Sequence, residues 1–150
     1  MSVFDKWNKS IDDGFRKEVE GYDRGEGGDF EKVPYGHYEV KVEKIEMGLS
    51  KKKQEPQMCI TWVILDGDQK KRRIWQYQNM TKQFGIHMAN EALRALGSGI
   101  EVKFHDYDQY SDLCMDIAEE VSKQKLEYGL RYYEEDGYDR FEVTDVFETE

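Results

Sequence analysis

The chain has 150 residues, a formal net charge of −10 and 38% hydrophobic residues, which fits one domain with an additional arm. It has neither an apolar run long enough to span a membrane nor an apolar signal core near its start. We therefore expect a cytoplasmic protein without a membrane partner. The two cysteines, Cys59 and Cys114, stand in apolar surroundings and are expected to be buried free thiols.

The charge is distributed unevenly along the chain. Residues 41–75 carry nine basic and five acidic residues, whereas residues 100–150 carry five basic and sixteen acidic ones. A phosphate responds to the local field rather than to the net charge, so the acidic composition does not exclude a nucleic-acid partner. The acidic last third fits simple solubility, repulsion of phosphate from other surfaces, or the binding of other proteins.

Residues 1–28 are expected to form an N-terminal arm, in which a short helix is ended by the glycines of "DRGEGGD". A folded domain over residues 29–150 follows, and it begins with a period of two residues, which indicates a strand. Tyr38 and Val42 share one face of this strand. The phase then slips, which predicts a β-bulge at Glu43–Lys44.

Two further strands are expected after the basic loop "SKKKQEP". The segment "QMCITWVIL" is apolar on both faces and reads as a central strand, "DGDQ" provides a turn, and "KRRIWQYQNM" is the returning strand.

Helical spacing replaces the strand pattern over about residues 81–122. Thr81 is the expected N-cap of the first helix, and one apolar stripe is formed by Phe84, Met88, Ala92, Leu93 and Leu96. A weaker helical pattern follows in "SDLCMDIAEEVSK". The chain then forms a hairpin in which an Asp136–Gly137 turn pairs Tyr132 with Phe141 and Leu130 with Val143.

These elements predict a mainly β protein with helices, of the α+β class. Five strands with a helix between the third and the fourth are the element order of an OB-fold, a partly open five-stranded barrel that often binds oligonucleotides. The expected architecture is therefore an OB-fold-like barrel with a helical insertion and an N-terminal arm.

The sequence contains no signature of catalysis. His37, His87 and His105 are not at metal-ligand spacing, and phosphate-binding glycine loops and nucleophile elbows are absent. The acidic turn around Asp106 and Asp112 lacks the glycine of a calcium loop and is better explained as a solvated turn. We therefore expect a protein that is not an enzyme and that needs no cofactor and no metal.

The segment from Ser50 to Met80 combines the two groups that bind single-stranded nucleic acid. Cations follow the phosphates, and flat rings stack on unpaired bases. If the turn between the second and third strands holds an even number of residues, Trp62, Trp75 and Tyr77 lie on one face. Core packing among Ile60 and its apolar neighbours remains the alternative for Trp62. The residues expected to contact single-stranded DNA are Lys51, Lys52, Lys53, Trp62, Lys71, Arg72, Arg73, Trp75, Tyr77, Arg131, Tyr133 and Arg140, with Lys70 beside them.

The stretch "FEKVPYGHYEVKVEKIEMGLSKKKQEPQMCITWVILDG", followed by "RRIWQY", resembles a family of small tailed-phage proteins. That family was long catalogued as a domain of unknown function and is associated with single-stranded DNA-binding proteins of phage replication and recombination gene clusters. The pattern falls on Phe30, Pro34, Gly36, Tyr38, Ser50, Lys51, Pro56, Met58, Gly67, Ile74 and the helix from Thr81. The resemblance covers about residues 28–97 and implies an OB-fold with sequence-tolerant binding of single strands. The chain departs from it by a more acidic last third and by lacking an acidic tip that ends in phenylalanine.

The first hypothesis is therefore a phage single-stranded DNA-binding protein in the host cytoplasm, with replication or recombination proteins as further partners. Pairing into a homodimer stays open. The alternative is an acidic DNA mimic that inhibits a host nuclease or defence enzyme by occupying its basic groove. A third hypothesis is an OB-fold adaptor that holds recombination proteins together without touching DNA.

Overall fold

The structure, a computed structural model, describes residues 5–9, 11–23 and 32–149. The chain divides into two compact units, Met1–Lys32 and Val33–Glu150. The boundary expected between residues 28 and 29 lies outside the described residues. In the first unit, the backbone N–H of Phe15 donates to the Asp12 carboxylate at 2.8 Å, an N-terminal cap that stabilises the start of the second helix.

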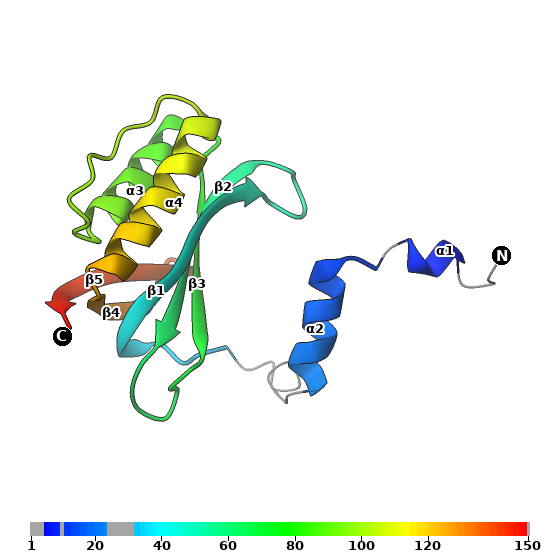
Figure 1. The fold of residues 1–150 in the computed structure, drawn as a ribbon, viewed down its shortest axis with the longest axis horizontal. Helices are drawn as coiled ribbons and strands as arrows, with labels where there is room; N and C mark the ends of the chain where they lie inside the picture. Colours follow the sequence, from blue (N-terminus) through cyan, green and yellow to red (C-terminus); the bar gives the residue numbers. More distant parts are fainter. Residues whose placement is uncertain (1–4, 10, 24–31, 150) are drawn as a thin grey trace. The chain divides into compact units, whose positions relative to one another are not determined.

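The helices and strands follow one another as α1 (Asp5–Asn8), α2 (Asp13–Asp23), β1 (Gly36–Leu49), β2 (Pro56–Ile64), β3 (Arg73–Asn79), α3 (Gln83–Arg94), α4 (Tyr107–Lys123), β4 (Leu126–Glu135) and β5 (Tyr138–Glu148). The five strands form one antiparallel sheet in the order β3-β2-β1-β4-β5. In the second unit, α3 and α4 lie side by side on one side of this curved sheet (Figure 1). The α+β class and the five antiparallel strands agree with the prediction.

The sheet is not closed, in contrast to the predicted barrel. Its two edges are β3 and β5, and no pairing between them occurs in the described part of the chain. The OB-fold order has one helix between the third and fourth strands, whereas two helices, α3 and α4, form there and are joined by residues 95–106. The second of them agrees with the weaker helical pattern in "SDLCMDIAEEVSK". Of these, α4 packs across β1, the middle strand, and α3 lies against β3.

Local chemistry explains where the strands bend and turn. The pairing of β1 with β2 shifts between Val42 and Lys44, so the predicted bulge is confirmed. The predicted pairing of Leu130 with Val143 is also confirmed. The turn that sets this register has positive φ angles at Asp136 and Gly137, a conformation that these two residue types adopt readily.

The predicted cap and stripe of α3 are partly wrong. Thr81 does not cap the helix, because its hydroxyl donates to the Glu55 carboxylate at 2.8 Å and the N-cap position is Lys82. Phe84 is 74% exposed, whereas Leu93 is fully buried. The apolar stripe therefore faces the sheet only in its C-terminal half.

One core joins the sheet to both helices. Trp62 of β2 and Tyr128 of β4 meet edge to face with ring centroids 5.5 Å apart. The Tyr128 hydroxyl donates to the Leu96 carbonyl at 2.7 Å, which satisfies its polar end. Cys59 and Cys114 are buried free thiols, as predicted, and burial raises the pKa of Cys114 to about 12.

Candidate nucleic-acid interface

The pairing of β2 with β3 decides which rings reach solvent. Ile74 lies opposite Trp62, and Trp75 lies opposite Thr61. Because side chains alternate along a strand, Ile74 faces the core, and Trp75 and Tyr77 face away from it. We call the side with the core residues the inner face and the other side the outer face. Trp75 is 50% exposed and Tyr77 is 59% exposed.

These two side chains form what we call the aromatic platform. They stand two residues apart on one strand, a spacing of about 6–7 Å. Burial raises the pKa of the Tyr77 hydroxyl, so this ring stays neutral at physiological pH. The platform is therefore a pair of uncharged aromatic rings presented in sequence along one strand edge.

The prediction that Trp62 shares this face is wrong. Its side chain is only 1% exposed, and its indole N–H donates to the Gln76 side-chain oxygen at 3.0 Å. The reason is the parity of the connection. Val63 pairs with Arg73, and the Ile64 N–H donates to the Arg72 carbonyl. An odd number of residues therefore separates Val63 from Arg73, which reverses the expected facing.

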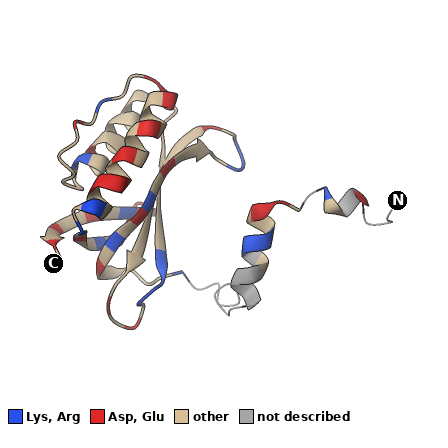
Figure 2. Ribbon diagram, viewed as in Figure 1, with Lys and Arg blue, Asp and Glu red and all other residues tan. Residues whose placement is uncertain are grey.

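Lysines lie at both ends of the β2–β3 hairpin, not on one side of it. Lys51, Lys52 and Lys53 are exposed in the turn between β1 and β2, whereas Lys70 and Lys71 are exposed in the connection between β2 and β3. These loops leave β2 at opposite ends, and Figure 2 shows basic residues in both. The part of the chain that the structure describes provides no ion-pair partner to these five lysines. The aromatic platform thus lies between two groups of cations.

Arg72 and Arg73, the two predicted arginines at the start of β3, are already engaged. Arg73 binds Glu43 through two hydrogen bonds of 2.7 and 2.9 Å, and these hold the pKa of Glu43 below its ordinary value. Arg72 donates to the Gln69 side chain at 2.5 Å. Arg73 therefore contributes less positive field to the outer face than its charge alone suggests.

The β4–β5 hairpin brings together the last three predicted residues. The guanidinium of Arg131 lies over the ring of Tyr133, 4.0 Å from its centroid, and also pairs with Glu142 at 3.7 Å. Tyr133 pairs across the hairpin with Arg140, whose guanidinium is 5.7 Å from the centroid of the Tyr138 ring. One face of Tyr133 is therefore already covered.

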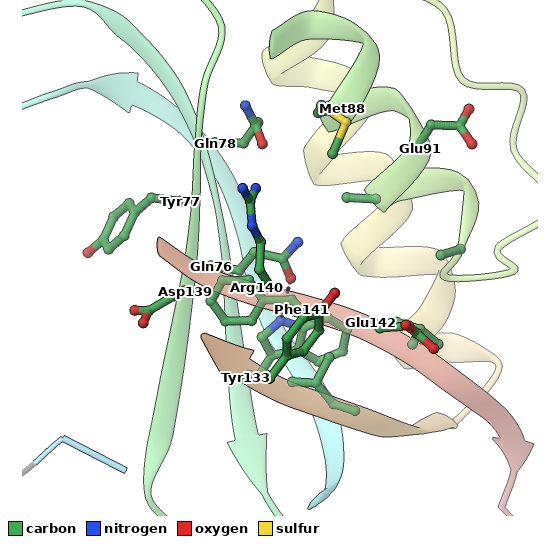
Figure 3. Close-up of a pocket in the computed structure, with 15 residues that line it drawn as sticks. Gln76, Tyr77, Gln78, Met88, Glu91, Tyr133, Asp139, Arg140, Phe141 and Glu142 are labelled. Carbon is green, nitrogen blue, oxygen red and sulfur yellow. Dashed lines mark hydrogen bonds between the residues drawn. The ribbon is translucent and has the colours of Figure 1, made fainter. Parts of the chain in front are cut away.

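A cleft of about 330 Å³ lies between the unpaired edges of the sheet. It is lined by residues of β2, β3, α3, β4 and β5, and Figure 3 labels Arg140 of β5 and Gln76 of β3 among them. Of the predicted site residues, the structure thus brings Trp62, Tyr77, Tyr133 and Arg140 to one cleft. Trp75, Arg131 and the lysines lie outside its lining.

Sequence reasoning missed Gln76, Met88 and Phe141 in this cleft. Gln76 alternates with Trp75 and Tyr77 and follows Ile74, so it lies on the inner face of an edge strand. A polar residue in that position is the signal that could have identified it. Met88 was assigned to the core stripe of α3, yet it is 37% exposed at the cleft.

The described residues contain neither a cluster of metal ligands nor a helix able to span a membrane. Within 5–9, 11–23 and 32–149, no group of three or more histidine, cysteine or acidic side chains is arranged to hold a metal ion. The helices among these residues are too short or too polar to cross a membrane.

The fold and the site define an α+β protein with an open five-stranded antiparallel sheet, an aromatic platform on its outer face and a cleft between its edge strands. The sequence profile of a family described as "Protein of unknown function (DUF669)" matches residues 20–145. The chain belongs to this family. No curated protein matches the chain.

Proposed function

We propose that the protein binds single-stranded DNA without strong dependence on sequence. The observation that carries this proposal is the aromatic platform, in which Trp75 and Tyr77 are each at least half exposed on one strand. Large aromatic side chains gathered on a surface usually mark a binding site. Stacking on an unpaired base contributes about 1–3 kcal/mol per base and requires no base-specific contact.

The lysines at both ends of the β2–β3 hairpin provide the positive charge that binding of a nucleic-acid backbone requires. They supply positive charge on either side of the rings, where a strand stacked on the platform would place its phosphates. Binding of this kind releases counterions and therefore weakens steeply as salt rises.

We further propose that the sheet is an OB-fold-like, partly open barrel. The β2–β3 surface and the β1–β2 and β4–β5 loops are the parts with which OB-folds bind oligonucleotides. In this chain they carry the platform, Lys51–Lys53 and the Asp136–Gly137 turn. The resemblance of residues 28–97 to phage single-stranded DNA-binding proteins supports a role in coating exposed strands during replication or recombination.

A fluorescence titration with labelled oligo(dT) of about 12 nucleotides tests the proposal, with a duplex of the same length as comparison. We expect tighter binding to the single strand and an affinity that falls with salt. Trp75→Ala should weaken binding by about 1–3 kcal/mol. Met115→Ala removes an exposed apolar side chain from α4, is the matched control, and should bind normally. A folded Trp75→Ala protein with unchanged affinity would refute the role of the platform.

The acidic surface of α4 favours a second candidate, inhibition by DNA mimicry. Asp108, Asp112, Asp116 and Glu119 are exposed on this helix, whose acidic residues are visible in Figure 2. Such a row could occupy a basic nuclease groove. This candidate predicts no binding of oligo(dT) at low salt. It also predicts inhibition of a host nuclease that is relieved by the triple variant Asp112→Asn, Asp116→Asn and Glu119→Gln.

A further inference from the structure

The cleft between β3 and β5 has the size of a site for one small ring. Its volume of about 330 Å³ is near the lower end of the range of about 300–1,000 Å³ that small-molecule sites occupy. Phe141 and Tyr133 are half-buried in its lining, and Met88 faces it from α3. Flat and flexible apolar side chains of this kind pack well against a planar ring.

The carboxylates of the cleft already have partners. Glu91 pairs with Arg94 at 2.6 Å, and Glu142 pairs with Arg131. Asp139 accepts a hydrogen bond of 2.6 Å from the hydroxyl of Tyr35. The acceptor capacity of these three groups is therefore partly used within the protein.

Two hydrogen-bond donors of the cleft, in contrast, lack partners in the part of the chain that the structure describes. The Nε of Arg140 is shielded from solvent and has no hydrogen-bond partner among the described residues, and no carboxylate pairs with this guanidinium there. The oxygen of Gln76 accepts from Trp62, which fixes the amide and leaves its NH₂ group without a partner in the described chain. Arg140 and Gln76 both line the cleft, and Figure 3 labels both side chains there. The cleft therefore offers hydrogen-bond donors, and a ligand that fits it must supply the acceptors.

The charge of the lining decides which kind of acceptor fits. Three carboxylates against one guanidinium disfavour a phosphate, which is better placed beside the exposed lysines. A neutral ring with two adjacent acceptors meets the donors without this repulsion. Guanine presents O6 and N7 on one edge, the pair that arginine binds most often, whereas adenine presents a donor amino group beside N7.

We infer that the cleft holds one unpaired base of the bound strand and selects guanine through Arg140 and Gln76. This inference rests on the proposed function, because the platform and the lysines must first bind the strand. The protein would then bind any single strand, with a preference set by one position.

The test uses four probes of about 12 nucleotides: oligo(dT), and the same strand with one central dG, dA or 7-deaza-dG. A single guanine avoids structures that form in guanine-rich strands. We expect the dG probe to bind at least about fivefold more tightly than the dA probe, since a bidentate contact discriminates by about that factor or more. The 7-deaza-dG probe lacks N7 and should lose most of the gain in affinity seen with dG. This comparison needs only the wild-type protein.

Two variants separate the cleft from the platform. Arg140→Lys keeps the charge but removes the guanidinium fork, so the preference for dG should disappear while oligo(dT) still binds. Trp75→Ala should weaken the binding of all four probes and leave the ratio of the affinities for the dG and dA probes unchanged. Gln76→Glu preserves the acceptor for Trp62 and removes the donor, and it should also abolish the preference.

The outcomes are distinguishable. If the wild-type protein binds none of the probes, the proposed function is wrong and the inference fails with it. If all four probes bind equally well, or if Arg140→Lys retains the preference for dG, the inference is overturned and single-strand binding stands. Tight binding of only a peptide or protein ligand in the cleft would also overturn it.

Discussion

The two faces of the β2–β3 hairpin use the same residue type for opposite purposes. Trp62 on the inner face is 1% exposed and holds the core together, whereas Trp75 on the outer face is 50% exposed. Each lies within a strand, and the two strands pair directly. Pairing register, and not the identity of the aromatic residue, therefore separates a structural ring from a candidate binding ring.

The faces also differ in what surrounds them. The inner face is covered by helices, and α4 presents acidic residues to solvent on its far side, whereas the loops at the ends of the hairpin carry lysines (Figure 2). In a chain with a net charge of −10, five exposed lysines thus lie in the loops at the ends of the hairpin that exposes the rings. The following predictions test this division between an interior that carries stability and an outer face that carries binding.

The largest effect is expected for Trp62→Ala, which removes a fully buried side chain. Loss of its packing on Tyr128 should lower the free energy of unfolding by about 3–5 kcal/mol. Urea denaturation followed by circular dichroism measures this change. Trp75→Ala is the matched control and should stay within about 0.5 kcal/mol of wild type. Equal losses in the two variants would contradict the division of faces.

A smaller loss of stability is expected for Gly85→Ala in α3. A Cβ at Gly85 would overlap the backbone carbonyl oxygen of Asn79, which is not a flexible side-chain end and cannot move aside cheaply. Overpacking of this kind costs about 1–3 kcal/mol. Gly48→Ala on β1 is the control, because its Cβ would meet nothing within 4 Å. A thermal melt of Gly85→Ala that matches the control would show that α3 is not seated against the end of β3 as described.

Replacing Lys51, Lys52 and Lys53 by serine tests the charge of the outer face without touching a ring. Each phosphate contact that is lost should reduce the slope of log affinity against log salt by about 0.7, so the slope should fall by up to about 2. The measurement is the salt-titrated binding of oligo(dT). Serine at Lys103, Lys123 and Lys125 changes the total charge equally and should leave the slope unaltered. A reduced slope in both triple variants would assign the effect to net charge.

The smallest effect is expected for Glu43→Gln, which releases Arg73. One additional cation beside the platform should steepen the salt slope by about 0.7 if Arg73 then reaches a phosphate.

Because the pKa of Glu43 is lowered by Arg73, the pair stabilises the fold above the ordinary glutamate pKa, and this contribution is lost as pH falls through the lowered value. The pair is partly exposed, so its loss should cost at most about 1 kcal/mol.

Glu101→Gln is the matched control for this change. It breaks another exposed pair, that of Glu101 with Lys103 at 3.1 Å, on the segment between α3 and α4. Its salt slope should equal that of the wild-type protein. A flatter slope for Glu43→Gln would mean that the ion pair positions the outer face for binding rather than masking a cation.

Local signals in the sequence were sufficient for much of the fold. The phase slip in β1 predicted its bulge, and the Asp136–Gly137 turn predicted the register of β4 with β5. These features depend on residues that are neighbours in the chain or in one tight hairpin. The positions of Trp75 and Tyr77 on one face followed from the alternation of a single strand.

Features that require two distant elements were not predictable in this way. The facing of Trp62 relative to Trp75 depends on the length of the connection between β2 and β3. The exposure of Phe84 and Met88 depends on where α3 meets the sheet. The cleft needs β3, α3 and β5 to come together from three separate parts of the chain.

The strands, the bulge, the last hairpin and the presence of rings and lysines in one segment follow from the residues alone, because alternation and turn chemistry are local properties. Three features arise only when distant elements pack together: one tryptophan is buried and the other exposed, Arg73 is held by Glu43, and the sheet stays open beside Arg140. These outcomes depend on register and on packing between distant segments. For the two tryptophans, a change of one residue in the connection between β2 and β3 would reverse the facing without altering the pattern of either strand.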